Sequence, residues 1–327
     1  MHRPGKTRFF IRYGFYKPKC RAWRVPRFLC RSCGRTFSRQ TFRADYRDRK
    51  PHLNAPLFHM LSSGLGLRQS ARKLPMSLRC AELKFRKMAR HLRHLNLNLR
   101  GPLPAGSVLQ FDELETFEGR RNARPLTLPV IIDRDSRFIL WAESAPIRPR
   151  GKMTAKRRKA IEQDEKRHGP RPNRSYRSIL RTLRRAAKLV AHLPRVVLQT
   201  DEKTAYGPLA RRAFGDRLVH ERTNSKLPRQ TWNPLFHINH TEAMARDLVS
   251  RLRRESWLVS KKARYLDLHL MIHMTYRNYV RPRFNFDPHR SSASVLGIVP
   301  RKMTVTEVLG WRQDWGRRSI HPLALKS

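Results

Sequence analysis

Acidic residues are scarce in this chain of 327 residues, which has 24 Asp and Glu against 72 Lys and Arg. The resulting net charge of +48 opposes a compact state through self-repulsion and favours a polyanionic partner. Lys and Arg neutralise phosphates, and the predominance of Arg suits bidentate phosphate contacts. We therefore expect a nucleic-acid partner, although an RNA-binding structural protein or a generic basic surface has a similar composition.

Long apolar runs and cysteines are also lacking. No stretch of about 18 apolar residues is present, so no membrane span is expected. The first residues lack the apolar segment and the small-residue cleavage site of a signal peptide. Four cysteines are too few for a disulfide framework in a chain of this length. We expect a cytoplasmic, nucleoid-associated protein.

The positive charge is densest in the first third of the chain. Residues 1–100 contain 26 Lys and Arg but only three Asp and Glu. The length of the chain also suggests two or more domains. A nucleic-acid-binding region placed ahead of a second functional unit is the simplest interpretation.

Two cysteines, Cys30 and Cys33, form a C-x-x-C-G knuckle, which commonly presents two thiolates to one Zn²⁺. A complete site needs four ligands, and the candidates upstream are Cys20 and His2. The sequence therefore predicts a partial zinc-ribbon-like region over residues 1–48, which either binds zinc or folds without it.

Residues 49–100 show a short helix, a Gly-containing turn, a second helix and a longer basic helix. This order is typical of a helix-turn-helix DNA-binding domain, and also of an ordinary three-helix bundle with a solvated basic face. The side chains expected to contact DNA lie on the third helix and on a later helix: Arg79, Lys84, Arg86, Lys87, Arg90, Arg253 and Arg254.

A change of pattern after a linker rich in Pro and Gly marks the start of a larger domain, residues 104–285. Three short apolar runs indicate a strand meander, and helix, strand, helix, strand and helix follow, which predicts a mixed α/β fold. Within it, the highly charged segment 148–175 is interpreted as a surface insertion. Residues 286–327 are expected to form a C-terminal tail.

Two aspartates fall on these predicted strands: Asp112 within the first and Asp201 at the end of the fourth. If the two strands are neighbours, the carboxylates meet at one edge of the sheet. Converging carboxylates favour Mg²⁺ or Mn²⁺, and two such ions can clamp both the attacking and the leaving oxygen of a phosphodiester. Strand-end aspartates are also common turn residues, so the spacing alone leaves both interpretations open.

Several segments carry a family resemblance: QFDELETF, QTDEKTAYGPL, INHTEAMARDLVSRLRRESWLVSKK, CRSCGRTFSRQTF and TYRNYVRPRFN. In this order they resemble bacterial insertion-sequence transposases of the D-D-E type, in the group with an N-terminal zinc ribbon and helix-turn-helix. The resemblance covers roughly residues 8–320. It implies an RNase H-like core, Asp112 and Asp201 as metal ligands, double-stranded DNA as partner, and a homo-oligomer on paired element ends.

The resemblance also implies a reaction in which water, and then a DNA 3′-hydroxyl, attacks phosphodiesters at the element ends without a covalent protein intermediate. Asn239 stands at the register of the family's third acid, and Glu242 follows on the same helical face. Asn can bind a hard cation through its carbonyl oxygen but brings no charge, so both are candidates for the third ligand. The family's further C-x-x-C is not found ahead of residue 8. A catalytically inactive transposase that only binds DNA is the alternative.

Overall fold

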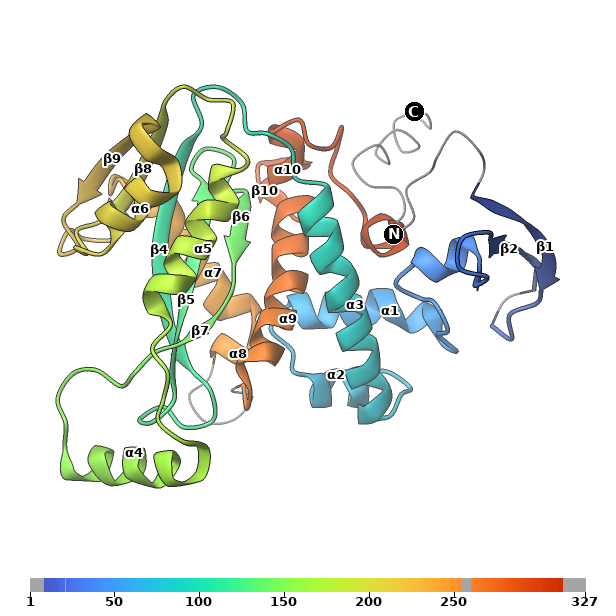
Figure 1. Ribbon diagram of the computed structural model, residues 1–327, viewed down its shortest axis with the longest axis horizontal. Helices are drawn as coiled ribbons and strands as arrows, with labels where there is room; N and C mark the ends of the chain where they lie inside the picture. The colour runs from blue at the N-terminus through green and yellow to red at the C-terminus, as the bar shows by residue number, and fades with distance from the viewer. Residues whose placement is uncertain (1–8, 21, 254–259, 314–327) are drawn as a thin grey trace.

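The structure, a computed structural model, describes residues 9–20, 22–253 and 260–313. It has a main sheet flanked by helices, a central helical region and a small sheet near the N-terminus (Figure 1). The fold is thus mixed α/β, and its main sheet combines parallel and antiparallel strands. Among the described residues, none of the helices combines the length and the apolar character that crossing a bilayer requires.

The small sheet is antiparallel, and its central strand β2 (Val25–Cys30) pairs with β1 (Phe10–Tyr16) and with β3 (Thr36–Phe37). Phe28, on β2, packs against Phe10 and Phe37 with ring centroids 5.2 and 5.6 Å apart. Aromatic packing across the strands therefore supports a sheet that is too small to enclose a core of its own.

The three helices predicted after this sheet are confirmed as α1 (Asn54–Ser62), α2 (Leu67–Lys73) and α3 (Leu78–Asn98). The side chain of Ser77 caps α3 by accepting a hydrogen bond from the backbone N–H of Cys80. The helix α3 lies along α9 (Ala263–Thr275) in the centre of the molecule (Figure 1).

One hydrophobic core runs through α1, α3, α9 and the main sheet. Inside it, Asn96 of α3 donates a hydrogen bond to Thr275 Oγ1 of α9 at 2.9 Å. The linker near residues 100–106 therefore marks a change from helix to strand, while apolar packing continues across it.

The main sheet has the strand order β6-β5-β4-β8-β9, with β7 paired to β5. Its strands are β4 (Val108–Phe117), β5 (Pro125–Asp133), β6 (Ile139–Ala142), β7 (Ala145–Pro146), β8 (Val196–Asp201) and β9 (Leu218–Thr223). The meander β4–β5–β6 is antiparallel, whereas β8 runs parallel to β4, and β9 runs parallel to β8. The strands expected from the apolar runs are confirmed.

Helices cover both faces of this sheet. On one face lie α5 (Ser175–Ala187) and α6 (Tyr206–Phe214), and α7 (Phe236–Leu248) lies behind the sheet in the view of Figure 1. The short helix α8 (Ser250–Arg253) follows α7, and a π-helical turn, Tyr276–Val280, continues α9. The described residues also contain 3₁₀ turns at Arg39–Phe42, Pro51–Leu53 and Gly215–Arg217.

The charged segment 148–175 contains the helix α4 (Ala155–His168), which projects at the lower edge of the molecule in Figure 1. Asp164 of α4 accepts a bond from Arg124 at 3.1 Å, and Arg171 donates to Glu118 at 2.7 Å. These two ion pairs attach the insertion to the end of β4.

The described part of the predicted C-terminal tail is folded. It forms β11 (Asp287–Ser291), which pairs with β10 (Pro282–Phe284), and the helices α10 (Ser292–Val295) and α11 (Val305–Gly310). Trp311 is buried and packs edge-on against His91 of α3, with ring centroids 5.5 Å apart. Trp311 therefore belongs to the hydrophobic core.

Candidate active site

Asp112 and Asp201 occupy equivalent positions on two neighbouring parallel strands. The register of β4 and β8 pairs Gln110 with Gln199, and each aspartate follows its glutamine by two residues. Because alternate residues of a strand point to the same side, both aspartates share the sheet face of the two glutamines. Each accepts a local backbone hydrogen bond, Asp112 Oδ1 from Glu113 N at 2.7 Å and Asp201 Oδ1 from Lys203 N at 3.0 Å.

The buried amide of Gln110 ties this face to α7. Its Nε2 donates to Gln199 Oε1 at 2.9 Å and to Pro234 O at 2.6 Å, and its Oε1 accepts from Ile238 N at 2.9 Å. Gln110 has no exposed surface, so these bonds are not shared with water. They fix the first turn of α7 beside the two aspartates. That helix carries both candidates for the third ligand.

Glu242 lies on α7 with 5% of its surface exposed, and its Oε1 has no hydrogen-bond partner among the described residues. Its pKa is raised to about 8, mainly by burial and also by the negative charges of Asp112 and Asp201, against the pull of Arg246 and Arg229. The charges of Asp112 and Asp201 therefore act on the Glu242 carboxyl. An unsatisfied buried carboxylate oxygen in such a group fits a site for a cation.

The pKa of Asp112 is also above its usual value. Burial is the main cause, and the charge of Asp201 adds to it, while the N–H of Glu113 and the charge of Arg229 act in the opposite direction. Arg229 is exposed in the loop before α7, and its charge acts on both Asp112 and Glu242.

Asn239 is half-buried one helical turn before Glu242. The structure thus places both residues on the helix that Gln110 ties to the aspartates. Which of them supplies the third ligand stays a prediction.

Glu113 points to the opposite face of the sheet from Asp112. It accepts hydrogen bonds from Tyr206 Oη at 3.0 Å and from Ser175 Oγ at 3.3 Å, and it forms an ion pair with Lys203. Glu113 therefore fastens α5 and α6 to β4. This explains part of the acid cluster in QFDELE without a role in the site.

Two strands carry the same tripeptide pattern, Gln-x-Asp, at 110–112 and 199–201. This repeated pattern is the signal in the sequence that marks the residues aligning the aspartates. The contribution of Arg229 could not be predicted, because it depends on how the loop before α7 returns to the sheet.

In the parts of the chain that the structure describes, no three His, Cys, Asp or Glu side chains are grouped so that they could hold a metal ion. Mg²⁺ is commonly bound by one or two carboxylates, water and substrate phosphates rather than by a closed protein cage. A pair of facing aspartates, with an unpartnered carboxylate oxygen nearby, fits that mode of binding. The donor atoms are oxygens, which favour Mg²⁺ or Mn²⁺.

The cysteine knuckle has the turn expected of it. Gly34, with a positive φ of 65°, donates from its backbone N–H to Cys30 O at 2.9 Å. Cys33 is exposed, Cys30 is buried, and the described residues show no further ligands grouped with them. Within residues 9–20 and 22–48 the structure therefore shows no zinc ribbon, and zinc binding stays a prediction. The candidate ligand His2 lies outside the described residues.

The predicted DNA contact at Lys84 is corrected by the structure, because this side chain is buried. Only 3% of its surface is exposed, and its ammonium group donates to Asp48 Oδ2 at 3.0 Å, Lys50 O at 2.7 Å and Asn54 Oδ1 at 2.8 Å. The amine is enclosed by residues from the segment before α1, so it cannot reach a phosphate.

The other predicted DNA contacts differ in exposure. Arg79 and Arg90 on α3 and Arg253 on α8 are exposed. Lys87 and Arg86 are partly engaged within the protein, with Lys87 Nζ 3.6 Å from Asp48 Oδ1 and Arg86 5.3 Å above the ring of Tyr265. Arg254 lies outside the described residues.

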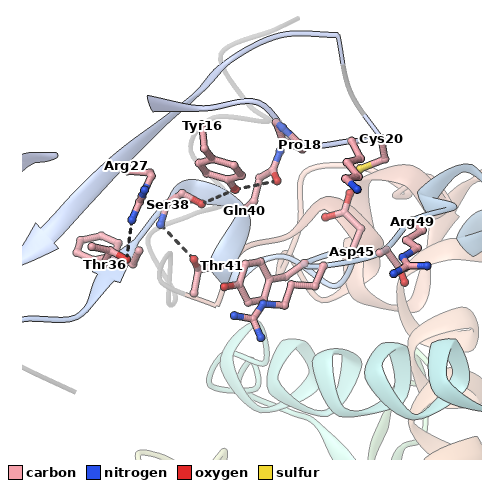
Figure 2. Close-up of a pocket in the computed structure, with 15 residues that line it drawn as sticks. Tyr16, Pro18, Cys20, Arg27, Thr36, Ser38, Gln40, Thr41, Asp45 and Arg49 are labelled. Carbon is pink, nitrogen blue, oxygen red and sulfur yellow. Dashed lines mark hydrogen bonds between the residues drawn. The ribbon is translucent and has the colours of Figure 1, made fainter. Parts of the chain in front are cut away.

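A groove of about 710 Å³ lies between the N-terminal sheet and the segment before α1, apart from the carboxylates (Figure 2). Hydroxyl groups and basic side chains line it. Tyr16 donates to Gln40 Oε1 at 3.2 Å, and Arg27 donates to Thr36 Oγ1 at 3.4 Å. The groove is basic and polar, with no trio of metal-binding side chains in the described part of the chain.

No protein family matches the chain, and no curated protein does. Among solved structures, a cryoEM structure of the simian T-cell lymphotropic virus intasome in complex with PP2A regulatory subunit B56 gamma is similar, with a TM-score of 0.27 and 9% sequence identity. The match covers 73% of this chain and 71% of that chain. A TM-score this low supports no conclusion about the function of this protein.

Proposed function

We propose that this protein is a DNA transposase of the D-D-E type, which binds the ends of its insertion element and catalyses metal-dependent phosphodiester cleavage and strand transfer. The main support is the placement of Asp112 and Asp201 at equivalent positions of adjacent parallel strands, with α7 tied to the same face. The strand order, an antiparallel meander followed by two parallel strands, is compatible with the RNase H-like core implied by the resemblance.

In this proposal Asp112 and Asp201 hold the divalent cation, and Glu242 or Asn239 supplies a further oxygen. When bound, the cation polarises the phosphodiester and stabilises negative charge on the attacking and leaving oxygens. In this proposal the protein's own residues position the reacting groups: the Gln110 amide holds α7 in place, and the exposed Arg229 pairs with a DNA phosphate. No protein side chain acts as nucleophile.

The acid cluster in QFDELE has a physical reason within this proposal. The negative charge of Asp201 disfavours ionisation of Asp112 and Glu242, in addition to the larger effect of burial, and ionised carboxylates repel DNA phosphates. A divalent cation offsets both repulsions, so acid is tolerated at one place on a chain of net charge +48. The remaining surface is free to bind DNA through Lys and Arg.

The experiment is strand transfer in vitro with the purified full-length chain, Mg²⁺ or Mn²⁺, and a labelled duplex that carries the DNA flanking the gene. We expect metal-dependent joining that Asp112→Asn and Asp201→Asn abolish. Glu242→Gln and Asn239→Ala decide the third ligand, because only the true ligand should reduce the rate by orders of magnitude. Glu115→Gln is the control, since Glu115 is exposed on the same strand.

The second candidate is a transposase-like protein that binds DNA without catalysis. The observation that favours it is the absence, in the described residues, of three metal-binding side chains grouped around one point. Specific duplex binding without cleavage under either metal would support this candidate and contradict the enzyme.

A further inference from the structure

The hairpin formed by β10 and β11 carries an unusually exposed aromatic side chain. Phe286, at its tip, is 84% exposed, more than any other large hydrophobic residue in the described chain. Apolar side chains at this exposure gain nothing from burial in the fold. A single exposed apolar side chain is common on protein surfaces, so the groups packed around Phe286 decide what it could bind.

The ring of Phe286 packs against another aromatic ring of the hairpin on one face. It stacks on Phe284 with centroids 4.9 Å apart and planes inclined by only 12°. Two guanidinium groups lie over Phe284, those of Arg137 and Arg283, each with Cζ 4.5 Å from the ring centroid. The tip is therefore the outer layer of a stack of flat groups.

This stack reaches the helix of the candidate active site. Arg137 is 9% exposed, lies 5.9 Å from the ring centroid of Phe236, and donates from Nε to His237 Nδ1 at 3.2 Å. Phe236 and His237 are the first two residues of α7, and Asn239 and Glu242 follow on the same helix. The order of contacts runs from the hairpin tip through Phe284 and Arg137 to α7.

Basic side chains lie on and beside the hairpin. Arg283 donates to Asp135 O at 3.1 Å, and Arg290 lies 3.5 Å from Asp287 within the hairpin. Arg281 and His289 lie on the same short segment. A flat aromatic face among cations is complementary to a ligand with flat rings and negative charge, which describes a nucleotide better than an apolar peptide or a lipid.

We propose that Phe286 stacks on a DNA base that has left the duplex near the active site, and that Phe284 and Arg137 hold the ring in position for this contact. The proposal rests on DNA being the substrate, as proposed above. A base inside an intact duplex is already stacked on both faces, so insertion of Phe286 there has to unstack a base step. A base at a frayed or cleaved end is already unstacked, and stacking of such bases on aromatic side chains is sequence-tolerant.

The experiment compares two DNA molecules with the full-length protein by fluorescence anisotropy at one salt concentration. The first is a blunt duplex, and the second is the same duplex with three unpaired bases at one end. We expect the native protein to prefer the splayed duplex. Phe286→Ala should reduce that preference by roughly fivefold to a hundredfold while duplex affinity is unchanged. Phe286→Tyr should keep it.

A matched control is Tyr176→Ala, which removes an exposed aromatic ring (64%) from α5 on the other side of the sheet. It should leave the preference unchanged. Because Phe286 is so exposed, its truncation should not alter folding, which thermal unfolding checks. 2-Aminopurine at the unpaired position reports stacking directly: the native protein should quench it, and Phe286→Ala should not.

Equal preference and equal quenching in the native protein and Phe286→Ala would overturn the proposal. This outcome is separate from the proposed function. Metal-dependent joining with no effect of Phe286→Ala on base stacking keeps the transposase and removes the stacking role. Stacking that depends on Phe286, without any joining, keeps the inference and contradicts the enzyme.

Discussion

Gln110 donates a hydrogen bond to Gln199 across two parallel strands at 2.9 Å, and each glutamine stands two residues before an aspartate. The pair therefore sets the register that brings Asp112 level with Asp201. The same Gln110 amide also bonds to the residues that begin α7. One buried side chain thus orients two strands and a helix around the candidate site.

Replacement of Gln110 by Leu tests this arrangement. It leaves Ile238 N, Pro234 O and Gln199 Oε1 without this partner inside the protein, so we expect the free energy of unfolding to fall by about 3 kcal/mol. Strand transfer should fall further than the stability loss explains, because α7 is no longer fixed. Urea unfolding and joining assays measure both effects. Gln163→Leu, on the exposed side of α4, is the control. Native stability in Gln110→Leu would show that the network is not structural.

Divalent cations should stabilise the folded protein through the aspartates. At a Mn²⁺ concentration ten times its Kd, the free energy of unfolding should rise by about 1.4 kcal/mol. Asp112→Asn and Asp201→Asn should abolish the increase, and Glu115→Gln should retain it. Thermal unfolding with and without Mn²⁺ measures the effect without any DNA. An increase of the same size in both aspartate variants would place the cation elsewhere.

Lys84 and Arg90 lie on the same helix, yet their substitution should affect different properties: stability for Lys84 and DNA binding for Arg90. Lys84→Met removes a buried cation from Asp48, Lys50 and Asn54, so stability should fall by about 3 kcal/mol. Arg90→Met, at an exposed position, should change stability by less than about 0.5 kcal/mol. It should instead reduce the slope of DNA affinity against salt by about one. A stable Lys84→Met variant that binds DNA weakly would restore Lys84 as a DNA contact.

His273 should make the protein sensitive to acid. It is buried on α9, and neither ring nitrogen has a hydrogen-bond partner among the described residues. Burial lowers its pKa to about 3, with smaller contributions from Arg277, His269 and Arg281.

In the unfolded chain the pKa of His273 is near the ordinary histidine value of 6.5, and in the folded chain it is about 3. Stability from this group is therefore complete above pH 6.5 and is lost as pH falls, by about 2 kcal/mol at pH 5. His273→Leu should reduce the pH dependence of urea unfolding between pH 7 and pH 5 by that amount. The control is His289→Leu, on the exposed hairpin. An unchanged pH dependence in His273→Leu would show that His273 is solvated.

The order of helices and strands could be predicted from the sequence, because apolar periodicity is a local property. The elements predicted in this way are α1 to α3, the meander β4 to β6, and the strand that ends at Asp201. Asp112 and Asp201 could also be identified as candidate metal ligands, since each lies on an apolar strand in a chain with little acid. These predictions needed only neighbours along the chain.

Tertiary structure alone decided which charged and polar groups are paired. Lys84 belongs to a basic helix in sequence, but Asp48, 36 residues away, makes it a buried structural residue. Gln110 and Gln199 are 89 residues apart, and only the parallel pairing of β4 with β8 joins them. Pairing of this kind depends on contacts between segments that are distant in the sequence, and local hydrophobic periodicity does not predict such contacts.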